Sequence, residues 1–352
     1  MLSKSSFRIF AFLFPFIFWG CSDDYLLDLG AESVPRTGTW LIDESYILQG
    51  CPGQDCIPSL TNPEMVQIGS PHLRYLDDND VVVGIKRGEN TYAFPHPILD
   101  WHEVVNMGDY TISYCPLTGS ALHMLDDRGF GVSGLLYNSN LIMYDKESNS
   151  FWPQMFLKSA AGSFSGEELV IDRMIETTWG TWKKLFPETY VVSSQTGYSR
   201  NYNAYPYGTF KSDNNINFPI KNSDSRLHPK RRVMGILSGS EARAYQIADF
   251  GTASIVHDVV GGENFVIFGS AVDNLAVVYQ TDKRFSVKTY DLDNGGILFT
   301  DSETGSVWNI FGEAVSGPLE SEVLDYGKSF ISYWFAWATF YPQTDIWKGV
   351  GK

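Results

Sequence analysis

Two stretches of this sequence match each other: "LIMYDKESNSFWPQM" at residues 141–155 and "ILFTDSETGSVWNIF" at residues 297–311. On one side of them "VVGIKRGENTYAF" aligns with "VMGILSGSEARAY", and on the other side "WKKLFPETYVV" aligns with "WATFYPQTDIW". The three pairs follow the same order along the chain. A long collinear repeat of this kind indicates two homologous units. We place them at residues 81–193 and 232–347, joined by a connection at 194–231, and expect a pseudo-twofold axis between them.

The fold class follows from short runs of β-branched and aromatic residues, such as "DVVVGI", "TISYC", "NFVIFGS" and "LAVVYQ", which lie between turn signals. Each unit also carries one helix signal near its end. In the first unit Thr177 or Thr178 can cap a helix that stops before Pro187. In the second, "YWFAWATFY" takes that place before Pro342. The sequence therefore predicts a predominantly β (β-rich α+β) fold with one short helix in each unit.

The repeat also sorts residues by role. Residues present in both copies, such as Asp145 with Asp301 and Trp152 with Trp308, are expected to form turns and core. Residues present in one copy are free to carry chemistry. Asp100, His102, Glu103 and Cys115 have no counterparts of the same type in the second unit, so we look for a site in the first unit.

Charge and motifs exclude several functional classes. The net charge of −15 repels a phosphate backbone, which argues against sequence-independent nucleic-acid binding. The chain has no phosphate-binding glycine loop, no His-Glu-x-x-His motif and no Gly-x-Ser-x-Gly elbow. A familiar hydrolase or nucleotide-dependent enzyme is therefore not indicated.

The N-terminus reads as an export signal. Lys4 and Arg8 precede an apolar run at residues 9–19, which is too short to span a bilayer and typical of a signal peptide. Gly20-Cys21 then resembles a lipoprotein cleavage box. We expect a signal peptide at 1–20, acylation of Cys21, and a tether at 21–44 that holds a single domain (45–347) at the outer membrane, on its periplasmic or cell-surface side. The alternative is ordinary secretion, in which Cys21 has no special role.

Three cysteines remain after Cys21. Cys51 and Cys56 flank Pro52 and Gly53, which favour a tight turn, and export places them in an oxidising compartment. We predict a disulfide between them, with a metal-binding pair as the alternative. Cys115 is then the unpaired thiol.

The segment "ILDWHEVVNMGDYTISYC" is interpreted as a hairpin that turns at residues 106–109. If Val105 pairs with Tyr110, His102 lies opposite Ser113 and Asp100 lies opposite Cys115. Because side chains alternate between faces, these groups then share one face, while Glu103 falls on the apolar face with Trp101.

This register would bring a carboxylate, an imidazole and a thiol together. His102 could then take the proton of Cys115 while Asp100 orients His102, as in a redox or transfer enzyme. Cys115 and His102 are also ligand types for zinc or copper. Further binding candidates are Glu103, His96, Thr118 and Ser113. The alternative is that the polar face is ordinary wetted surface and that Cys115 only packs.

The connection offers a second kind of function. It is rich in Asn, Ser, Gly and Tyr, and its tyrosines at 198, 202, 205 and 207 are suited to hold a glycan or a partner protein. In that case the chain is a non-catalytic binding lipoprotein whose only membrane contact is the lipid anchor.

Several motifs in order, "GQDCIPSLTNP", "FPHPILDWHEVVN", "SYCPLTGSAL", "GVSGLLYNSNLIMYD", "FPETYVVSSQTGYSRNY" and "FAWATFYPQT", resemble the bacterial family known as domain of unknown function 3179. The resemblance runs from about residue 45 to 345 and implies no settled activity. Many members have a second cysteine where this chain has Thr118, so the resemblance does not give this chain a dithiol. Members commonly have glycine in place of Cys51 and Cys56, which makes the predicted disulfide a local addition.

Overall fold

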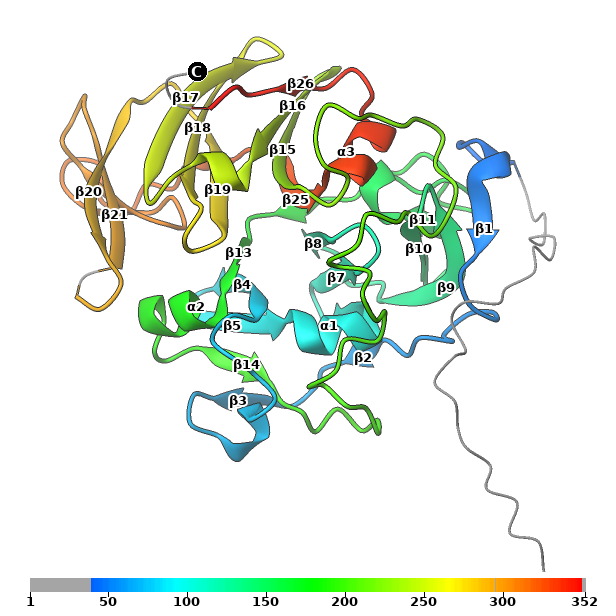
Figure 1. Cartoon of the computed structure of the whole chain (residues 1–352). Coiled ribbons are helices and arrows are strands. Elements are labelled where there is room, and N and C mark those ends of the chain that lie inside the picture. Colours follow the sequence, from blue (N-terminus) through cyan, green and yellow to red (C-terminus); the bar gives the residue numbers. More distant parts are fainter. Residues whose placement is uncertain (1–38, 295, 350–352) are drawn as a thin grey trace, which may run out of the picture.

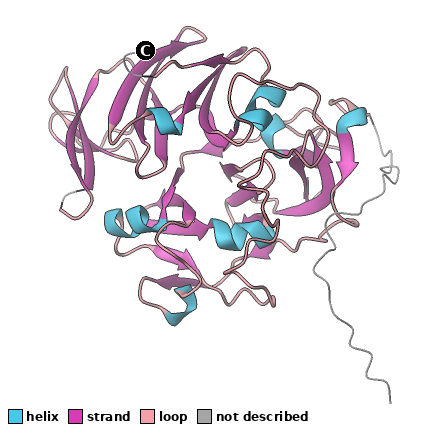
Figure 2. Cartoon of the chain, viewed as in Figure 1, coloured by secondary structure: helices cyan, strands magenta, loops and turns pink. Residues whose placement is uncertain are grey.

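The computed structural model describes residues 39–294 and 296–349. The predicted signal peptide, Cys21 and most of the tether lie outside the described residues. Strands predominate, as Figures 1 and 2 show. Those of the described residues form six sheets, three from each unit. The predominantly β prediction is confirmed. Among the described residues, no helix combines the length and apolar character needed to cross a membrane.

The first unit, with the segment before it, forms three sheets. The first sheet has the order β13 (Ile175–Thr178), β4 (Val81–Arg87), β5 (Asn90–Pro95), β14 (Tyr190–Val192) and β3 (Met65–Gln67). The second is β12 (Ile171–Asp172), β8 (Ser120–Met124), β7 (Thr111–Cys115), β6 (Val104–Asn106) and β2 (Leu60–Thr61). The third is β1 (Ile47–Gln49), β9 (Phe130–Tyr137), β10 (Asn140–Asp145) and β11 (Phe151–Pro153).

The second unit repeats this pattern. Its first sheet is β25 (Ser329–Tyr333), β15 (Arg232–Ser238), β16 (Glu241–Gln246) and β26 (Asp345–Ile346). Its second is β17 (Ser254–Val260), β18 (Glu263–Ser270), β19 (Leu275–Gln280) and β24 (Asp325–Tyr326). Its third is β20 (Phe285–Asp291), β21 (Gly296–Asp301), β22 (Val307–Asn309) and β23 (Ala314–Ser316).

Corresponding strands pair in the same way in both units. For example, β14 runs parallel to β5, and β26 runs parallel to β16, whereas the other pairs of these two sheets are antiparallel. The two copies also share a side-chain hydrogen bond. Asp145 accepts it from Trp152 Nε1 at 2.9 Å in the first unit, and Asp301 accepts it from Trp308 Nε1 at 2.9 Å in the second. The scaffold role predicted for these residues fits this geometry. The unit boundaries and the pseudo-twofold axis stay predictions.

Within residues 39–294 and 296–349, three α-helices and four short 3-10 helices complete the fold. They are α1 (His96–His102), α2 (Trp179–Leu185), α3 (Trp334–Phe340), η1 (Glu44–Tyr46), η2 (Pro71–Leu73), η3 (Gln154–Phe156) and η4 (Ile247–Asp249). Helix α2 begins after Thr178, whose side chain accepts a hydrogen bond from the Thr181 amide, as predicted. The prediction of one short helix in each unit was wrong for the first unit, which contains α1 as well as α2. The second unit has only the single turn η4 at the place of α1.

Each unit packs its last helix against the other unit. The α2 residues Trp182 and Leu185 lie near the third sheet of the second unit, and the ring centroids of Trp182 and Phe311 are 6.3 Å apart. In turn, α3 lies beside the third sheet of the first unit, where Phe340 contacts Tyr137 at 5.6 Å between ring centroids (Figure 1). The largest hydrophobic cluster therefore contains residues of both units.

Candidate functional site

The predicted hairpin at residues 98–115 forms only beside its turn, where residues 104–106 pair with 111–113, and its predicted register was wrong. Asp100 and His102 lie on α1, and only residues 104–106 pair with β7, where Val105 lies opposite Ile112 rather than Tyr110. The physical reason is Pro97, which fits the first turn of a helix because its missing N–H needs no partner there. The face expected to unite Asp100, His102 and Cys115 therefore does not exist.

The Cys115 thiol is buried at the end of β7. Its Sγ accepts a hydrogen bond from the Leu141 amide at 3.4 Å and lies 3.9 Å from the Ser139 carbonyl oxygen. Burial, reinforced by the nearby Glu103 carboxyl, raises the pKa of Cys115 to about 11. A thiol of this kind stays protonated at neutral pH and is a poor nucleophile.

Both ring nitrogens of His102 are engaged. Nδ1 donates to the Pro58 carbonyl oxygen at 2.8 Å, and Nε2 accepts from the Tyr202 hydroxyl at 2.7 Å. Burial lowers the pKa of His102 to about 4, so the ring is neutral near pH 7. Neither nitrogen is left for Cys115 or for zinc or copper. No group of three or more His, Cys, Asp or Glu side chains is placed to hold a metal within the described ranges.

Asp100 and His96 belong to a buried ionic group where the two units meet. Asp100 Oδ2 accepts from Lys211 Nζ at 2.9 Å, and burial still raises the pKa of Asp100 to about 6. His96 Nε2 lies 3.1 Å from Glu176 Oε2, and Arg232 donates a hydrogen bond to this oxygen at 3.0 Å. Burial lowers the pKa of His96 to about 4, so the lasting ion pair is that of Glu176 with Arg232.

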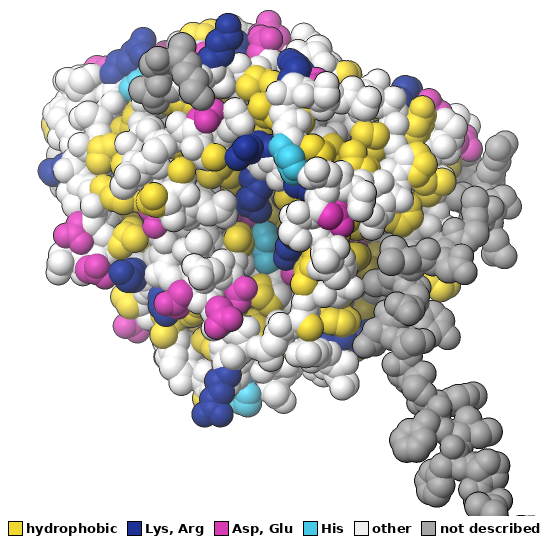
Figure 3. Space-filling view, in the orientation of Figure 1, with side chains coloured by type: hydrophobic (Ala, Val, Ile, Leu, Met, Phe, Trp, Pro, Cys, Tyr) yellow, Lys and Arg dark blue, Asp and Glu magenta, His cyan; other side chains and the backbone are white. Residues whose placement is uncertain are grey.

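Basic and histidine side chains gather in the middle of one face, in the region where the two units meet (Figure 3). The sequence did not single out Glu176 or Arg232. Each lies on a first-sheet strand of its own unit, Glu176 on β13 and Arg232 on β15. Only the packing of the two units brings them together.

Thr118 and Ser113 belong to a structural network. The Ser113 hydroxyl accepts from Gln154 Nε2 at 2.9 Å, and Thr118 Oγ1 accepts from Asn140 Nδ2 at 2.9 Å. Both side chains are fully buried. Ser120 Oγ joins the same network by donating to Gln154 at 2.6 Å. These hydrogen bonds fasten β7 and β8 to η3.

A pocket opens beside this network, between the first unit and the connection. Its cavity has a volume of about 590 Å³. It is lined by residues at 50–57, 132–141 and 206–218, together with Glu103 and Leu117. Most of the first-unit wall is aliphatic, whereas the connection contributes both aromatic rings and polar groups. This size and composition are typical of sites for small organic molecules.

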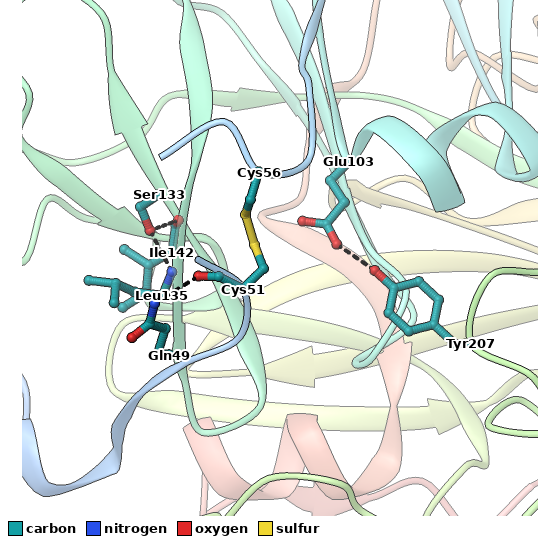
Figure 4. The surroundings of a disulfide bond; sticks show 8 residues. All are labelled: Gln49, Cys51, Cys56, Glu103, Ser133, Leu135, Ile142 and Tyr207. Carbon is teal, nitrogen blue, oxygen red and sulfur yellow. Dashed lines mark hydrogen bonds between the residues drawn. A yellow bond between two sulfur atoms is a disulfide. The ribbon is translucent and has the colours of Figure 1, made fainter. Parts of the chain in front are cut away.

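Glu103 is the ionisable group that the first unit contributes to this wall. It ends α1 with a backbone φ of 56°, which turns the chain toward β6. Its Oε1 accepts a hydrogen bond from the Tyr207 hydroxyl at 3.0 Å, as Figure 4 shows. Burial raises the pKa of Glu103 to about 8, and Tyr207 opposes this only in part. In the sequence, the one indication of a special role for Glu103 was that a carboxyl group fell on the predicted apolar face.

The Cys51–Cys56 disulfide closes the opposite side of the pocket. The two Cα atoms are 6.2 Å apart, so the predicted pairing is present, and Cys51 lines the wall. The loop fits closely against β9, since a Cβ at Gly134 would lie 2.4 Å from the Gly53 carbonyl oxygen. Gly134 also has a φ of 81°, which glycine adopts without strain.

The connection is fastened across the pocket by hydrogen bonds at several points. The Lys221 amide donates to Asn138 Oδ1 at 2.8 Å, and Ser139 Oγ donates to the Phe218 carbonyl at 2.9 Å. On the other side Trp101 Nε1 donates to the Ala204 carbonyl at 3.1 Å. Of the four tyrosines considered above, only Tyr207 lines the pocket, while Tyr198 is 44% exposed.

Comparison with known proteins identifies the family of this chain. The model of the family described as "Protein of unknown function (DUF3179)" matches residues 54–344, which is most of the chain. The chain belongs to this family. No curated protein and no solved structure matches it significantly. The family assignment confirms the resemblance and supplies no activity, so a function for this family member has to be argued from the pocket.

Proposed function

We propose that this protein is a binding protein that holds a small, largely apolar molecule in the pocket between the first unit and the connection. The observation that carries the proposal is the cavity of about 590 Å³ itself, which has a mainly aliphatic wall and few polar groups. The sequence suggested a binding protein for a glycan or a partner protein as the alternative, and this proposal keeps the binding role with a smaller, apolar ligand. A thiol-centred activity has less support, because Cys115 is buried and its pKa is raised.

A neutral, environment-sensitive dye tests the proposal. Prodan, an uncharged naphthyl ketone, should bind the purified protein with a blue-shifted, saturable emission. Ile57 is a half-buried wall residue, so Ile57→Trp should fill part of the cavity and weaken prodan binding about tenfold or more.

The matched control is Ile68→Trp, which places the same substitution at a position that is 37% exposed and outside the pocket wall. This variant should bind prodan like the wild type. Absence of saturable prodan binding, or equal loss in both variants, would reject the pocket as a binding site.

The setting of this binding protein is also a proposal. The basic residues Lys4 and Arg8, the apolar run and Gly20-Cys21 support export and acylation of Cys21 at the outer membrane. The Cys51–Cys56 disulfide is consistent with an oxidising compartment. Cys21→Ser should abolish metabolic labelling with palmitate and release the protein from membranes. A variant that stays membrane-bound and labelled would contradict the anchor.

A further inference from the structure

Glu103 presents one free carboxyl oxygen to the pocket. Oε1 receives the Tyr207 hydroxyl, whereas Oε2 has no hydrogen-bond partner among the residues that the structure describes. In Figure 4 this second oxygen is directed toward the disulfide, across the space that Cys51 and Glu103 both line. The residue itself is buried, with an exposed fraction of 5%. An oxygen of a buried carboxyl group with no partner in the protein is a natural anchor for a ligand.

The surroundings decide what Glu103 can offer there. Tyr207 donates to it from the connection, and burial keeps the pKa of Tyr207 well above its usual value, so Tyr207 remains a donor. Asp100 on α1 adds to the negative potential around Glu103, whereas the Cys115 thiol on β7 is protonated near pH 7 and adds no charge. Asp213 lies on the same pocket wall. No cation is paired with Glu103 in the described part of the chain, since Lys211 is engaged with Asp100.

These groups favour the neutral acid, whose O–H donates a hydrogen bond. Because Tyr207 already occupies Oε1 as a donor, the acid proton resides on Oε2, the oxygen that faces the cavity. The pocket therefore offers one O–H donor at the edge of an aliphatic wall. Near pH 7 most molecules carry this proton, since the pKa of Glu103 is about 8.

We propose that the pocket selects an uncharged molecule with a hydrogen-bond acceptor, such as a ketone, ester or amide carbonyl, at one end of an apolar body, and that the Glu103 acid donates to this acceptor. This inference rests on the proposed binding function and specifies its ligand class. Carboxylates are disfavoured because they would lose favourable hydration against the mainly aliphatic wall. A cationic amine would instead require the ionised form of Glu103.

The pH dependence of prodan binding tests this. The prodan carbonyl needs the Glu103 proton, so affinity should be constant below about pH 7 and fall about tenfold for each pH unit above about 8. Glu103→Gln supplies an amide N–H donor that does not titrate and should make the affinity independent of pH. Tyr207→Phe removes a hydrogen bond that lowers the Glu103 pKa, so the fall should move to higher pH.

Glu168→Gln is the matched control, because it makes the same substitution at an exposed position outside the pocket wall and should leave the alkaline fall in place. The wild type alone gives a further readout that does not depend on the folding of any variant. The infrared band of a protonated carboxyl group should disappear as the pH passes about 8 and should shift when prodan binds.

The outcomes separate the two proposals. Prodan that binds, is weakened by Ile57→Trp, and yet shows no pH dependence would overturn the Glu103 inference and leave the binding function standing. The same holds if a cationic naphthylalkylamine binds more tightly than prodan at pH 7. If prodan does not bind at all, both proposals fall.

Discussion

Cys115 shows how burial rather than residue type decides reactivity. Its thiol is 1% exposed and accepts a backbone hydrogen bond from Leu141, and no basic group is placed to take its proton within the described chain. The charge of a thiolate would be desolvated there and would lie near Glu103, which is why the pKa of Cys115 rises to about 11.

We therefore expect Cys115 to resist alkylation in the native protein. Iodoacetamide at pH 7.5 should label it at a rate at least about a hundredfold below that of a free cysteine, because labelling requires local opening. His102→Ala should not slow this labelling further. Rapid native labelling that His102→Ala suppresses would restore the thiol-centred hypothesis.

Glu103 should make stability depend on pH in the alkaline direction. Its pKa is raised from 4.5 in the unfolded chain to about 8 in the folded protein, so the folded state binds more protons between these values. The contribution is thus fully present below about pH 4.5 and is lost as the pH rises through about 8. The loss amounts to a few kcal/mol at most, because each tenfold change in proton affinity corresponds to about 1.4 kcal/mol.

Urea unfolding at pH 5, 7 and 9 measures this contribution. The wild type should lose stability across the series, and Glu103→Gln should lose clearly less, because its amide has no proton to release. Asp100 contributes in the same direction at lower pH, since its pKa is also raised, to about 6. Parallel curves for wild type and Glu103→Gln would contradict the assignment.

At the scale of elements, a glycine and a tryptophan fix the distance between a strand and a helix in each unit. A Cβ at Gly84 would lie 2.0 Å from the Trp182 ring, and one at Gly235 would lie 2.1 Å from the Trp337 ring. Trp182 Nε1 donates to Thr189 at 3.1 Å, and Trp337 Nε1 donates to Thr344 at 3.0 Å. Neither indole can move away without losing this hydrogen bond.

Gly84→Ala and Gly235→Ala should each destabilise the protein by about 2–3 kcal/mol through overpacking. Chemical denaturation with a double-mutant cycle checks the cause. Trp182→Leu combined with Gly84→Ala should cost less than the sum of the two single changes, because the smaller side chain relieves the clash. Strict additivity would show that the clash is not the source.

At the scale of the whole molecule, the two units share buried contacts. Glu176 of the first unit pairs with Arg232 of the second, and Thr181 Oγ1 donates to Asp273 Oδ1 at 2.7 Å. In the opposite direction, the Tyr333 amide of the second unit donates a hydrogen bond to the Thr118 carbonyl oxygen of the first at 2.7 Å. With a common hydrophobic cluster as well, we expect one cooperative unfolding transition rather than two.

Glu176→Gln should lower the free energy of unfolding by about 2–3 kcal/mol, because it removes the charge partner of Arg232, whose side chain is only 20% exposed. Glu168→Gln is the control. Glu168 pairs with Lys158 and Lys328 at an exposed position, where an ion pair contributes at most about 1 kcal/mol. Urea unfolding followed by tryptophan fluorescence measures both. Equal effects would mean that the ionic group between the units is not structurally important.

The sequence by itself determined the elements that depend on local chemistry. The repeat predicted two sets of strands, Thr177 or Thr178 predicted the start of α2, and the spacing of Cys51 and Cys56 predicted their disulfide. Signals of this kind act within a few residues or recur at a fixed offset, so they can be read without the fold. The helix signal of Pro97 is equally local, but it conflicts with the hairpin that the β-branched residues after it predict.

Only the tertiary structure decided the site. The pocket is built from residues at 50–57, 132–141 and 206–218, which no local pattern connects. The partners of Glu103 and His102 are Tyr207 and Tyr202 of the connection, about a hundred positions away in the chain. The protonation states of the site residues also depend on the tertiary structure. A pKa is set by burial and by neighbouring charges, and both arise only when distant segments pack together.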